Sequence, residues 1–380
     1  MRTPAMHVFV VIHDFQPGGV ERIATRLATQ WASTGLKITL ICGRPVGALK
    51  SLMSDRVSLV SPVRQLKRGP FSRLRLAAFV ACVAKQERPH VIFLPGNFYA
   101  AASALIRLLL GVACPRIVCK LSNPLRRSDR GTARQRLFDR SIRWKTNFCD
   151  HLVFMSPELQ QEAIGLISDV STKSSVIDEP ILDSRFEPPG RMHVQATDDT
   201  IKLVAASRLV HQKRLDVMIT AMAMIGNRSI RLKIFGEGPC RKQLEGRIAS
   251  LGLDQKVELV GYSDDWRTDL QDARLYLLSS EFEGFPAVVI EALASGVPVV
   301  ATNCSPAMHS ILSSSQLGSV VDKGNPESFA DAVDRQLDSP RPDPMHLAKS
   351  VERFRLESSA AAYVELFDRL ATASPGVTPA

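Results

Sequence analysis

Two glutamates, Glu283 and Glu291, stand around the expected start of a helix, with seven residues between them. Gly284 and Pro286 place Glu283 in a loop and start the helix at about Pro286, since proline is favoured at the first helical position. Glu291 then lies on that helix, more than one turn in. Carboxylates accept hydrogen bonds from sugar hydroxyls, so the pair suits an oxygen-rich ligand. A hydrolase with paired carboxylates is an alternative, although one acid in a loop and one on a helix define no such geometry.

The backbone of the same loop is expected to supply donors. The N–H groups from Phe285 to Val288, including that of Ala287, are predicted to be unpaired at the helix start, except at Pro286, which has none. Such groups donate to sugar or phosphate oxygens. Two glutamates at this spacing are, without other motifs, equally typical of an ordinary protein surface.

Two cations follow the first expected strand of the second half of the chain. Arg208 and Lys213 lie five residues apart in a loop that should open at the carboxyl end of that strand. Paired cations there suit a diphosphate, whose charge must be neutralised as it leaves. A pair of solvated surface cations is the alternative, but loops at this edge of a sheet commonly carry function.

Glycines occupy two further turns. Gly18 and Gly19 stand where the first strand should turn into the first helix, a place where backbone N–H groups bind phosphate. Gly236, in the stretch FGEGP, would let a flat ligand such as a base approach the backbone. Each is also compatible with a plain tight turn. The G-x-G-x-x-G fingerprint is absent, which argues against a nicotinamide dehydrogenase.

Length and composition exclude several classes. The chain has 380 residues, 45% hydrophobic and 23% charged, so two globular domains are expected rather than disorder. No apolar run approaches the roughly 18–20 residues that a membrane-spanning helix needs, and we expect no signal peptide. The seven cysteines include no C-x-x-C pair, which predicts free thiols in a reducing cytoplasm, with neither a zinc site nor a disulfide framework.

Charge is distributed unevenly. Residues 1–190 carry 27 Lys and Arg against 14 Asp and Glu, whereas residues 191–380 carry 21 against 24. The basic half indicates contact with an anionic partner: nucleic acid, a phosphorylated small molecule or a membrane surface. The run 126–145 holds eight basic and two acidic residues, and four large apolar residues are interleaved: Leu137, Phe138, Ile142 and Trp144. It is typical of a membrane-surface or phosphate-binding helix, or of a solvated helix face, and no nucleic-acid-binding module is recognisable.

The elements that must position these residues alternate between strands and helices. Buried strands are expected at 8–12, 38–42, 57–60, 91–94, 116–121 and 151–155, and then at 202–206, 231–235, 257–260, 275–278 and 297–301. This alternation predicts an α/β fold with two Rossmann-like parallel-sheet domains facing a central cleft, where ligands bind at the carboxyl ends of the strands.

The domain boundary is predicted from composition. Residues 178–200 contain three prolines, many polar residues and little periodicity. We therefore expect an N-terminal domain at 1–180, a linker at 181–200 and a C-terminal domain at 201–349. The helical segment at about 350–372 is a candidate to pack back on the first domain.

The motifs together resemble glycosyltransferase family 4, the retaining, group 1 nucleotide-sugar enzymes of the GT-B fold. The stretches that carry the resemblance occur in the family's order and span most of the chain: GGVERIATRLA from Gly18, SRLVHQKRLD from Ser207, FGEGP from Phe235, LVGYSDD from Leu259 and EGFPAVVIEALASGVPVVATN from Glu283. The resemblance implies that Arg208 and Lys213 clamp the donor diphosphate, that Glu283 contacts the donor sugar and that Glu291 contacts the ribose.

The same match implies the remaining donor-site residues. Glu283, Arg208 and Lys213 are the catalytic candidates. The other positions implied to bind the donor are Gly18, Gly19, Gly236, Gly261, Tyr262, Gly284, Phe285, Pro286 and Ala287.

Two positions depart from the family pattern. Many members have a histidine at the end of a first-domain strand, near the transferred sugar, whereas this chain has CKLSNP, with Ser122 or Asn123 at that place. With Asn97, these residues are candidates for the acceptor site, in a hydrogen-bonding role. The glycine that commonly follows the clamp lysine is replaced by Arg214.

The resemblance implies a function with several open parts. It implies retaining transfer of a sugar from a nucleoside-diphosphate sugar to a glycan or polyprenyl-diphosphate-linked acceptor, as in cell-surface polysaccharide or lipopolysaccharide assembly. No cofactor and no metal are expected, because cationic side chains would stabilise the leaving group. The expected location is cytoplasmic, with the inner face of the cytoplasmic membrane as a candidate surface and nucleic acid excluded. A non-catalytic sugar-nucleotide-binding protein, an epimerase and a phosphorylase are the alternatives.

Overall fold

The computed structural model describes residues 6–69, 71–126, 131–184, 186, 200–226, 228–263 and 266–372. The chain divides into two compact units, which we call the first unit (Met1–Pro180 with Arg355–Ala380) and the second unit (Ile181–Phe354). Most of the predicted linker at 181–200 lies outside the described residues, as do Asp264, Asp265 and residues 127–130 of the basic run.

The first unit is built on a seven-stranded sheet in the order β3-β2-β1-β4-β5-β6-β7. Every neighbouring pair is parallel. The strands are β1 (His7–Asp14), β2 (Lys37–Arg44), β3 (Ser58–Val60), β4 (Val91–Leu94), β5 (Arg116–Leu121), β6 (His151–Phe154) and β7 (Ser174–Val176). The central strands are buried along their whole length because helices cover both faces of a parallel sheet, which explains their continuous apolar runs.

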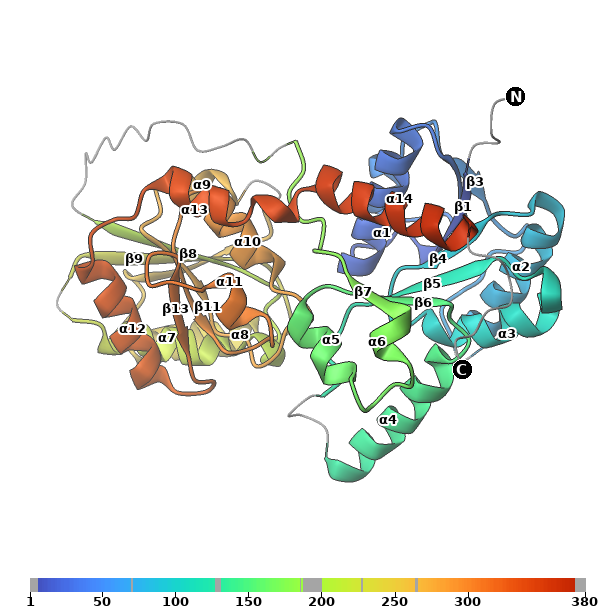
Figure 1. Cartoon of the computed structure of the whole chain (residues 1–380). Helices are drawn as coiled ribbons and strands as arrows, with labels where there is room; N and C mark the ends of the chain where they lie inside the picture. Colours follow the sequence, from blue (N-terminus) through green and yellow to red (C-terminus); the bar gives the residue numbers. More distant parts are fainter. Residues whose placement is uncertain are drawn as a thin grey trace. The chain divides into compact units, whose positions relative to one another are not determined.

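Seven α-helices of the first unit are described: α1 (Gly19–Ser33), α2 (Ser72–Glu87), α3 (Ala100–Leu110), α4 (Thr132–Thr146), α5 (Pro157–Ala163), α6 (Val170–Lys173) and α14 (Leu356–Thr372); the 3₁₀ turns are η1 (Ala48–Leu52) and η2 (Gly111–Ala113). Helix α14 lies beside α1 (Figure 1), and its buried side chains belong to the same core as those of α1 and β1. Trp31 anchors this contact: its indole N–H donates to the Ala360 carbonyl at 3.1 Å, and its ring meets those of Tyr363 and Phe367 edge-on.

The second unit has a six-stranded sheet in the order β10-β9-β8-β11-β12-β13, again with parallel neighbours. Its strands are β8 (Ile201–Ala206), β9 (Ile230–Phe235), β10 (Val257–Gly261), β11 (Leu275–Leu278), β12 (Val299–Thr302) and β13 (Gly318–Val321). Its helices are α7 (Leu215–Met224), α8 (Arg241–Ser250), α9 (Thr268–Gln271), α10 (Ala287–Ala294), α11 (Met308–Ile311), α12 (Pro326–Asp338) and α13 (Pro344–Ser350), with 3₁₀ turns η3 (His211–Lys213) and η4 (Glu352–Phe354).

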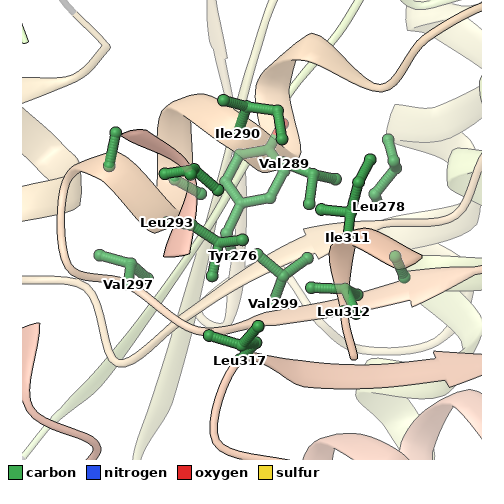
Figure 2. Packing of buried hydrophobic residues seen from close by; sticks show 14 of the residues in the cluster. Tyr276, Leu278, Val289, Ile290, Leu293, Val297, Val299, Ile311, Leu312 and Leu317 are labelled. Atoms are coloured by element: carbon green, nitrogen blue, oxygen red, sulfur yellow. The ribbon is translucent and has the colours of Figure 1, made fainter. Parts of the chain in front are cut away.

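The segment Glu283–Asn303, which carries the strongest motif of the sequence, contributes to one hydrophobic core of the second unit. Figure 2 shows Val289, Ile290 and Leu293 of α10 packed around Tyr276, with Val299 of β12 close by. These side chains are buried, so this face of α10 packs against the sheet. The loop that precedes α10 carries Glu283.

The predicted architecture is confirmed: the two domains are parallel-sheet α/β units, and each expected strand coincides with an observed one, at least in part. Two strands were missed. Strand β7 is a short polar edge strand, and β13 opens on Gly318, where a Cβ would lie 1.8 Å from the Val299 carbonyl oxygen. Neither has the apolar run on which the prediction relied. Among the described residues, no helix is both long enough and apolar enough to cross a membrane.

Candidate functional site

Three loops of the second unit meet at the carboxyl ends of β8, β9 and β10. A Cβ at Gly236 would lie 1.9 Å from the Ser207 carbonyl oxygen, and one at Gly238 would lie 2.3 Å from that of Leu209. Gly236 also has a positive φ of 132° and donates its N–H to the Gly261 carbonyl at 2.7 Å. The FGEGP glycines are therefore required for the loop after β9 to pack against the two neighbouring loops.

The cation pair predicted from SRLVHQKRLD emerges from the first of these loops. Arg208 is exposed, and the described part of the chain offers it no ion-pair partner. Lys213 ends η3, and its Nζ lies 2.5 Å from Oε1 of Glu283; the two side chains are only 15% and 14% exposed. The structure thus brings two of the three predicted catalytic residues into direct contact, although 70 residues separate them in the chain.

The loop that carries Glu283 is held by several hydrogen bonds. The Ser280 hydroxyl donates to Oε1 of Glu283 at 2.6 Å, and the Glu283 N–H donates to the Cys304 carbonyl at 2.7 Å. Gln212 ties the cation loop to the same segment by donating to the Phe282 carbonyl at 2.7 Å. The carboxylate therefore has a defined position at the carboxyl edge of the sheet.

The helix start differs in detail from the prediction. Pro286 caps α10 and Ala287 is its first residue, whereas Pro286 was expected at the first helical position. The Ala287 N–H donates to the Phe285 carbonyl at 2.9 Å, so it is not an unpaired donor as predicted. The ring of Phe285 packs against that of Phe354, with centroids 5.4 Å apart. Gly284 belongs to the same loop, and its carbonyl accepts from the Ser305 hydroxyl at 3.4 Å.

Glu291 lies on α10, as predicted, and pairs with a residue that the sequence did not single out. Its Oε1 is 3.3 Å from Nη2 of Arg267. Both glutamates lie close to the buried phenol of Tyr276: burial raises the pKa of Tyr276, and the charges of Glu291 and Glu283 raise it further. The hydroxyl of Tyr276 bonds to the N–H and the carbonyl of Ala206, the last residue of β8, each at 3.0 Å. The Tyr276 hydroxyl therefore joins β11 to the end of β8, the strand that precedes Arg208.

Gly261, predicted near the nucleotide base, is the last residue of β10, and Tyr262, predicted with it, follows the strand. Gly261 has a positive φ of 99°, and the side chain of Tyr262 is exposed. Cys304 accepts a hydrogen bond from the Glu283 N–H through its carbonyl. Burial raises the pKa of its thiol to about 12, and the charge of Glu283 adds to the effect, so the thiol stays protonated at neutral pH.

In the first unit, the glycine turn opens α1. Gly18 is the helix cap, without a capping side chain, and Gly19 is the first helical residue. A Cβ at Gly18 would lie 2.6 Å from Oε2 of Glu21, whereas Gly19 has open space beside it. The uncapped N–H groups of this 15-residue helix make its start suitable for an anion.

A charged network that was not predicted lies next to this turn. Arg68 donates to both carboxylate oxygens of Asp14, at 2.7 and 2.9 Å, and also reaches Glu21 at 3.3 Å. Burial by itself would raise the pKa of Asp14, but the hydrogen bonds from Arg68 and from the Gln16 N–H outweigh it and lower the pKa. Asp14 is a carboxylate at the end of the buried strand β1, a signal that was overlooked in the sequence.

Asn97, Ser122 and Asn123, the candidate acceptor residues, are brought together after β4 and β5. The Asn97 Oδ1 accepts from the Ser122 N–H at 2.6 Å and from the Asn123 N–H at 3.3 Å. The Ser122 Oγ is buried, and the described residues provide it no hydrogen-bond partner. A Cβ at Gly96 would approach this hydroxyl to 3.2 Å, so the glycine leaves room beside it. Over the described ranges, no group of three or more His, Cys, Asp and Glu side chains is arranged to hold a metal ion.

Comparison with known families identifies the class of protein. The model described as glycosyl transferases group 1 matches residues 191–354, and the one described as a glycosyl transferase 4-like domain matches residues 18–170. The chain belongs to the group 1, glycosyltransferase 4-like family of glycosyltransferases.

Curated relatives match only part of their own length. An exopolysaccharide phosphotransferase of Streptomyces coelicolor is 36% identical over 36% of this chain and 15% of its own. An uncharacterized glycosyltransferase of Methanocaldococcus jannaschii is 33% identical over 49% of this chain and 50% of its own. The putative colanic acid biosynthesis glycosyltransferase WcaL of Escherichia coli is 32% identical over 31% of each chain.

Solved structures of similar fold cover nearly the whole chain. HepE of Anabaena in complex with UDP has a TM-score of 0.77 at 18% identity, over 96% of this chain and 100% of its own. The lipopolysaccharide outer core galactosyltransferase WaaB has a TM-score of 0.74 at 16% identity, over the same shares. The fold is therefore GT-B, and the expected family and fold are both confirmed.

Proposed function

We propose that this protein is a retaining glycosyltransferase that transfers a sugar from a nucleoside-diphosphate sugar to a glycan or lipid-linked acceptor in cell-surface polysaccharide or lipopolysaccharide biosynthesis. The observation that carries the proposal is the contact of Lys213 with Glu283 beside the exposed Arg208. A cation next to the diphosphate and an acid next to the sugar are what departure of a diphosphate from an anomeric carbon requires. The complex of HepE with UDP supports a nucleotide ligand for this fold.

The proposal assigns each charge a task. Arg208 and Lys213 neutralise the diphosphate as the bond from the anomeric carbon to its oxygen breaks. Glu283 accepts a hydrogen bond from the sugar and stabilises positive charge at the anomeric carbon, and Glu291 binds the ribose. Because two fixed cations neutralise the leaving group, the proposed reaction requires no metal ion and no cofactor. In the first unit, Gly18 and Gly19 contact the donor phosphate, and Asn97, Ser122 and Asn123 form part of the acceptor site.

A membrane-bound acceptor is supported by the outer surface of α4. Leu137 and Trp144 are 70% and 54% exposed on this helix, with the exposed Arg136 and Arg140 on the same side. Ile142, predicted in the same set, is buried against the first unit. The helix therefore presents a mixed basic and apolar face, which suits the headgroup region of an anionic bilayer.

The start of α2 extends this surface. Phe71 and Leu74 are exposed there, and the Arg73 guanidinium lies 4.2 Å from the centroid of the Phe98 ring. Burial lowers the pKa of Lys145 on α4, and the charge of Arg73 lowers it further, so the start of α2 and the end of α4 lie within range of each other's charge. We call the set Phe71, Arg73, Leu74, Leu137, Arg140 and Trp144 the basic-apolar surface. The proposed location is thus the cytoplasm, peripheral on the inner face of the cytoplasmic membrane.

A donor screen tests the proposed function. Thermal unfolding of the full chain would be followed with UDP-, GDP-, ADP- and CMP-sugars, because a ligand that binds the folded state raises the midpoint by mass action. The best donor would then be incubated with lipid-linked and soluble acceptors, with and without EDTA, and the anomeric configuration of the product read by NMR. We expect one donor class to stabilise the protein, EDTA to have no effect and the product to retain its configuration. Inversion, phosphorolysis or epimerisation without transfer would contradict the proposal.

A further inference from the structure

Arg267 lies just before α9, with its guanidinium against the carboxylate of Glu291. The Nη2–Oε1 distance is 3.3 Å, and the two side chains are only 22% and 15% exposed. The two residues are 24 positions apart in the chain, so their contact is a product of the tertiary structure. The pair therefore connects the loop after β10 to the helix that follows Glu283.

Aromatic rings confine this guanidinium. Its central carbon lies 4.9 Å from the ring centroid of Phe186 and 5.8 Å from that of Trp266. Trp266 in turn lies against Tyr276, with centroids 5.9 Å apart. Ring faces attract a cation, but they offer no acceptor in the plane of its N–H groups. Arg267 is thereby held in place while its in-plane donors remain available for acceptors.

One of those donors is unused within the described part of the chain. The Nε atom of Arg267 is buried and has no hydrogen-bond partner there. A buried donor without a partner is costly, so such groups commonly bind a water molecule or a ligand. The group lies where a ligand is expected, because α10, which carries Glu291, directly follows the loop in which Glu283 contacts Lys213.

The cationic side chains around the site pair with different carboxylates. Lys213 pairs with Glu283, and Arg214 pairs with Asp216 and Glu281, so these cations serve the loops next to the proposed diphosphate position. Arg267 is the cation that contacts the proposed ribose carboxylate. If the ion pair only stabilised the packing of α9 against α10, it would not change the relative affinity of the protein for different nucleotides.

We propose that Arg267 is a positioning residue for the nucleoside half of the donor: it holds the Glu291 carboxylate toward the ribose hydroxyls and offers its own N–H groups to a ribose oxygen. The site would thereby select ribose over deoxyribose. This inference rests on the proposed function, in which Glu291 binds the ribose.

Nucleotide binding by the full chain tests it. Affinities for UDP, 2′-deoxy-UDP and 3′-deoxy-UDP would be measured by calorimetry, with the guanosine series as a second set, for wild type, Arg267→Gln and Arg267→Lys. We expect wild type to favour the ribonucleotide, and Arg267→Gln to reduce that preference about tenfold, as the loss of a charged hydrogen bond does. Arg267→Lys should restore part of it. Donor KM should rise while kcat changes little.

Arg228→Gln is the matched control. It removes another arginine of the second unit, paired with Asp334 and Asp338 on α12, and should leave every affinity ratio unchanged. Unchanged ribose preference in Arg267→Gln, with only a lower unfolding midpoint, would show a structural tie and overturn the inference alone. If wild type binds no uridine, guanosine, adenosine or cytidine nucleotide in the same assay, the proposed function fails and the inference with it.

Discussion

The candidate donor residues of the second unit and the candidate acceptor residues of the first unit differ in their use of charge. In the second unit, the candidate carboxylates Glu283 and Glu291 each have a cationic partner on another loop, and Arg208 stays exposed. In the first unit, the candidate acceptor residues Asn97, Ser122 and Asn123 are neutral, and they interact through an amide oxygen and backbone N–H groups. There the excess of cations lies on the helices, notably at Arg136 and Arg140 of α4.

This difference follows from what each unit is proposed to bind. A nucleoside diphosphate has fixed charges and a fixed length, so a site for it needs cations and acids at set distances. An acceptor offers hydroxyl groups, which neutral donors and acceptors recognise. If the acceptor is anchored in a membrane, charge is useful on the surface that meets the bilayer.

The largest expected effect follows from breaking the ion pair between Lys213 and Glu283 in the second unit. Lys213→Ala and Glu283→Ala should each lower the transfer rate by about 10²–10³-fold, because each removes a group that stabilises charge in the transition state. Initial rates with the donor found by the screen would measure this, and circular dichroism would check folding. Asp216→Ala, which breaks a neighbouring surface pair of Arg214, is the control and should retain most activity. Full activity in either test variant would remove that residue from the mechanism.

Acid should weaken the first unit through a buried histidine on β6. Burial lowers the pKa of His151 to about 4, and the charge of Arg369 adds to the effect. The unfolded chain binds this proton at a higher pH, near 6.5, so the contribution is complete above about pH 6.5 and is lost as pH falls toward 4. The loss should reach at most about 3 kcal/mol.

Urea unfolding of wild type and His151→Gln between pH 4 and 7.5 would measure the effect. The variant should show a flatter dependence on pH over that window. His309→Gln, on α11 of the second unit, provides a control at a site without this burial. An equally steep dependence in His151→Gln would assign the acid sensitivity to other groups.

The neutral candidate acceptor residues of the first unit are tested at Asn97. Asn97→Leu removes the oxygen that holds the Ser122 and Asn123 N–H groups and should raise the acceptor KM about tenfold. Asn97→Asp keeps an acceptor oxygen there and should retain most of the activity. Donor KM should not change in either variant. A rise in donor KM with acceptor KM constant would place these residues on the donor side instead.

The smallest expected effect concerns the basic-apolar surface. Arg140→Gln should weaken binding to vesicles containing anionic lipid about fivefold, since one cation near such a surface contributes about 1 kcal/mol. Co-sedimentation at low and high salt would measure it, with neutral vesicles as a reference. Arg228→Gln should bind as wild type does. No binding to anionic vesicles at either salt concentration would remove the membrane from the proposal.

Much of the second-unit site could be predicted from the sequence because its residues occur in contiguous motifs. Arg208 and Lys213 share one loop, and Glu283, Gly284 and Glu291 share one loop and helix. The sequence could not predict Arg267, Ser280 or Tyr276, since each reaches the site through a contact with a different segment. The free N–H of Ala287 was wrongly predicted, because the Phe285 carbonyl turns back to accept it.

Less of the first-unit site was predictable. Asn97 and Ser122 were identified as candidates, but Asp14, Glu21 and Arg68 were not, although they surround the predicted glycine turn. Arg68 lies 54 residues from Asp14, and nothing local indicates that its loop returns to the end of β1. The apolar residues of 126–145 also appeared equivalent in the sequence, whereas folding buries Ile142 and exposes Trp144.

By itself, the sequence determined that the chain forms two parallel α/β units, because buried strands on both faces require apolar runs and the helices between them require stripes of period 3.6. Through the family resemblance it also predicted which cations and acids form the donor site. Only the tertiary structure decided that Lys213 contacts Glu283, that Arg267 contacts Glu291, and that Leu137 and Trp144 face outward. The reason is physical: these contacts join segments whose distance in space depends on how loops close and helices rotate, and side-chain patterns along the chain do not specify either.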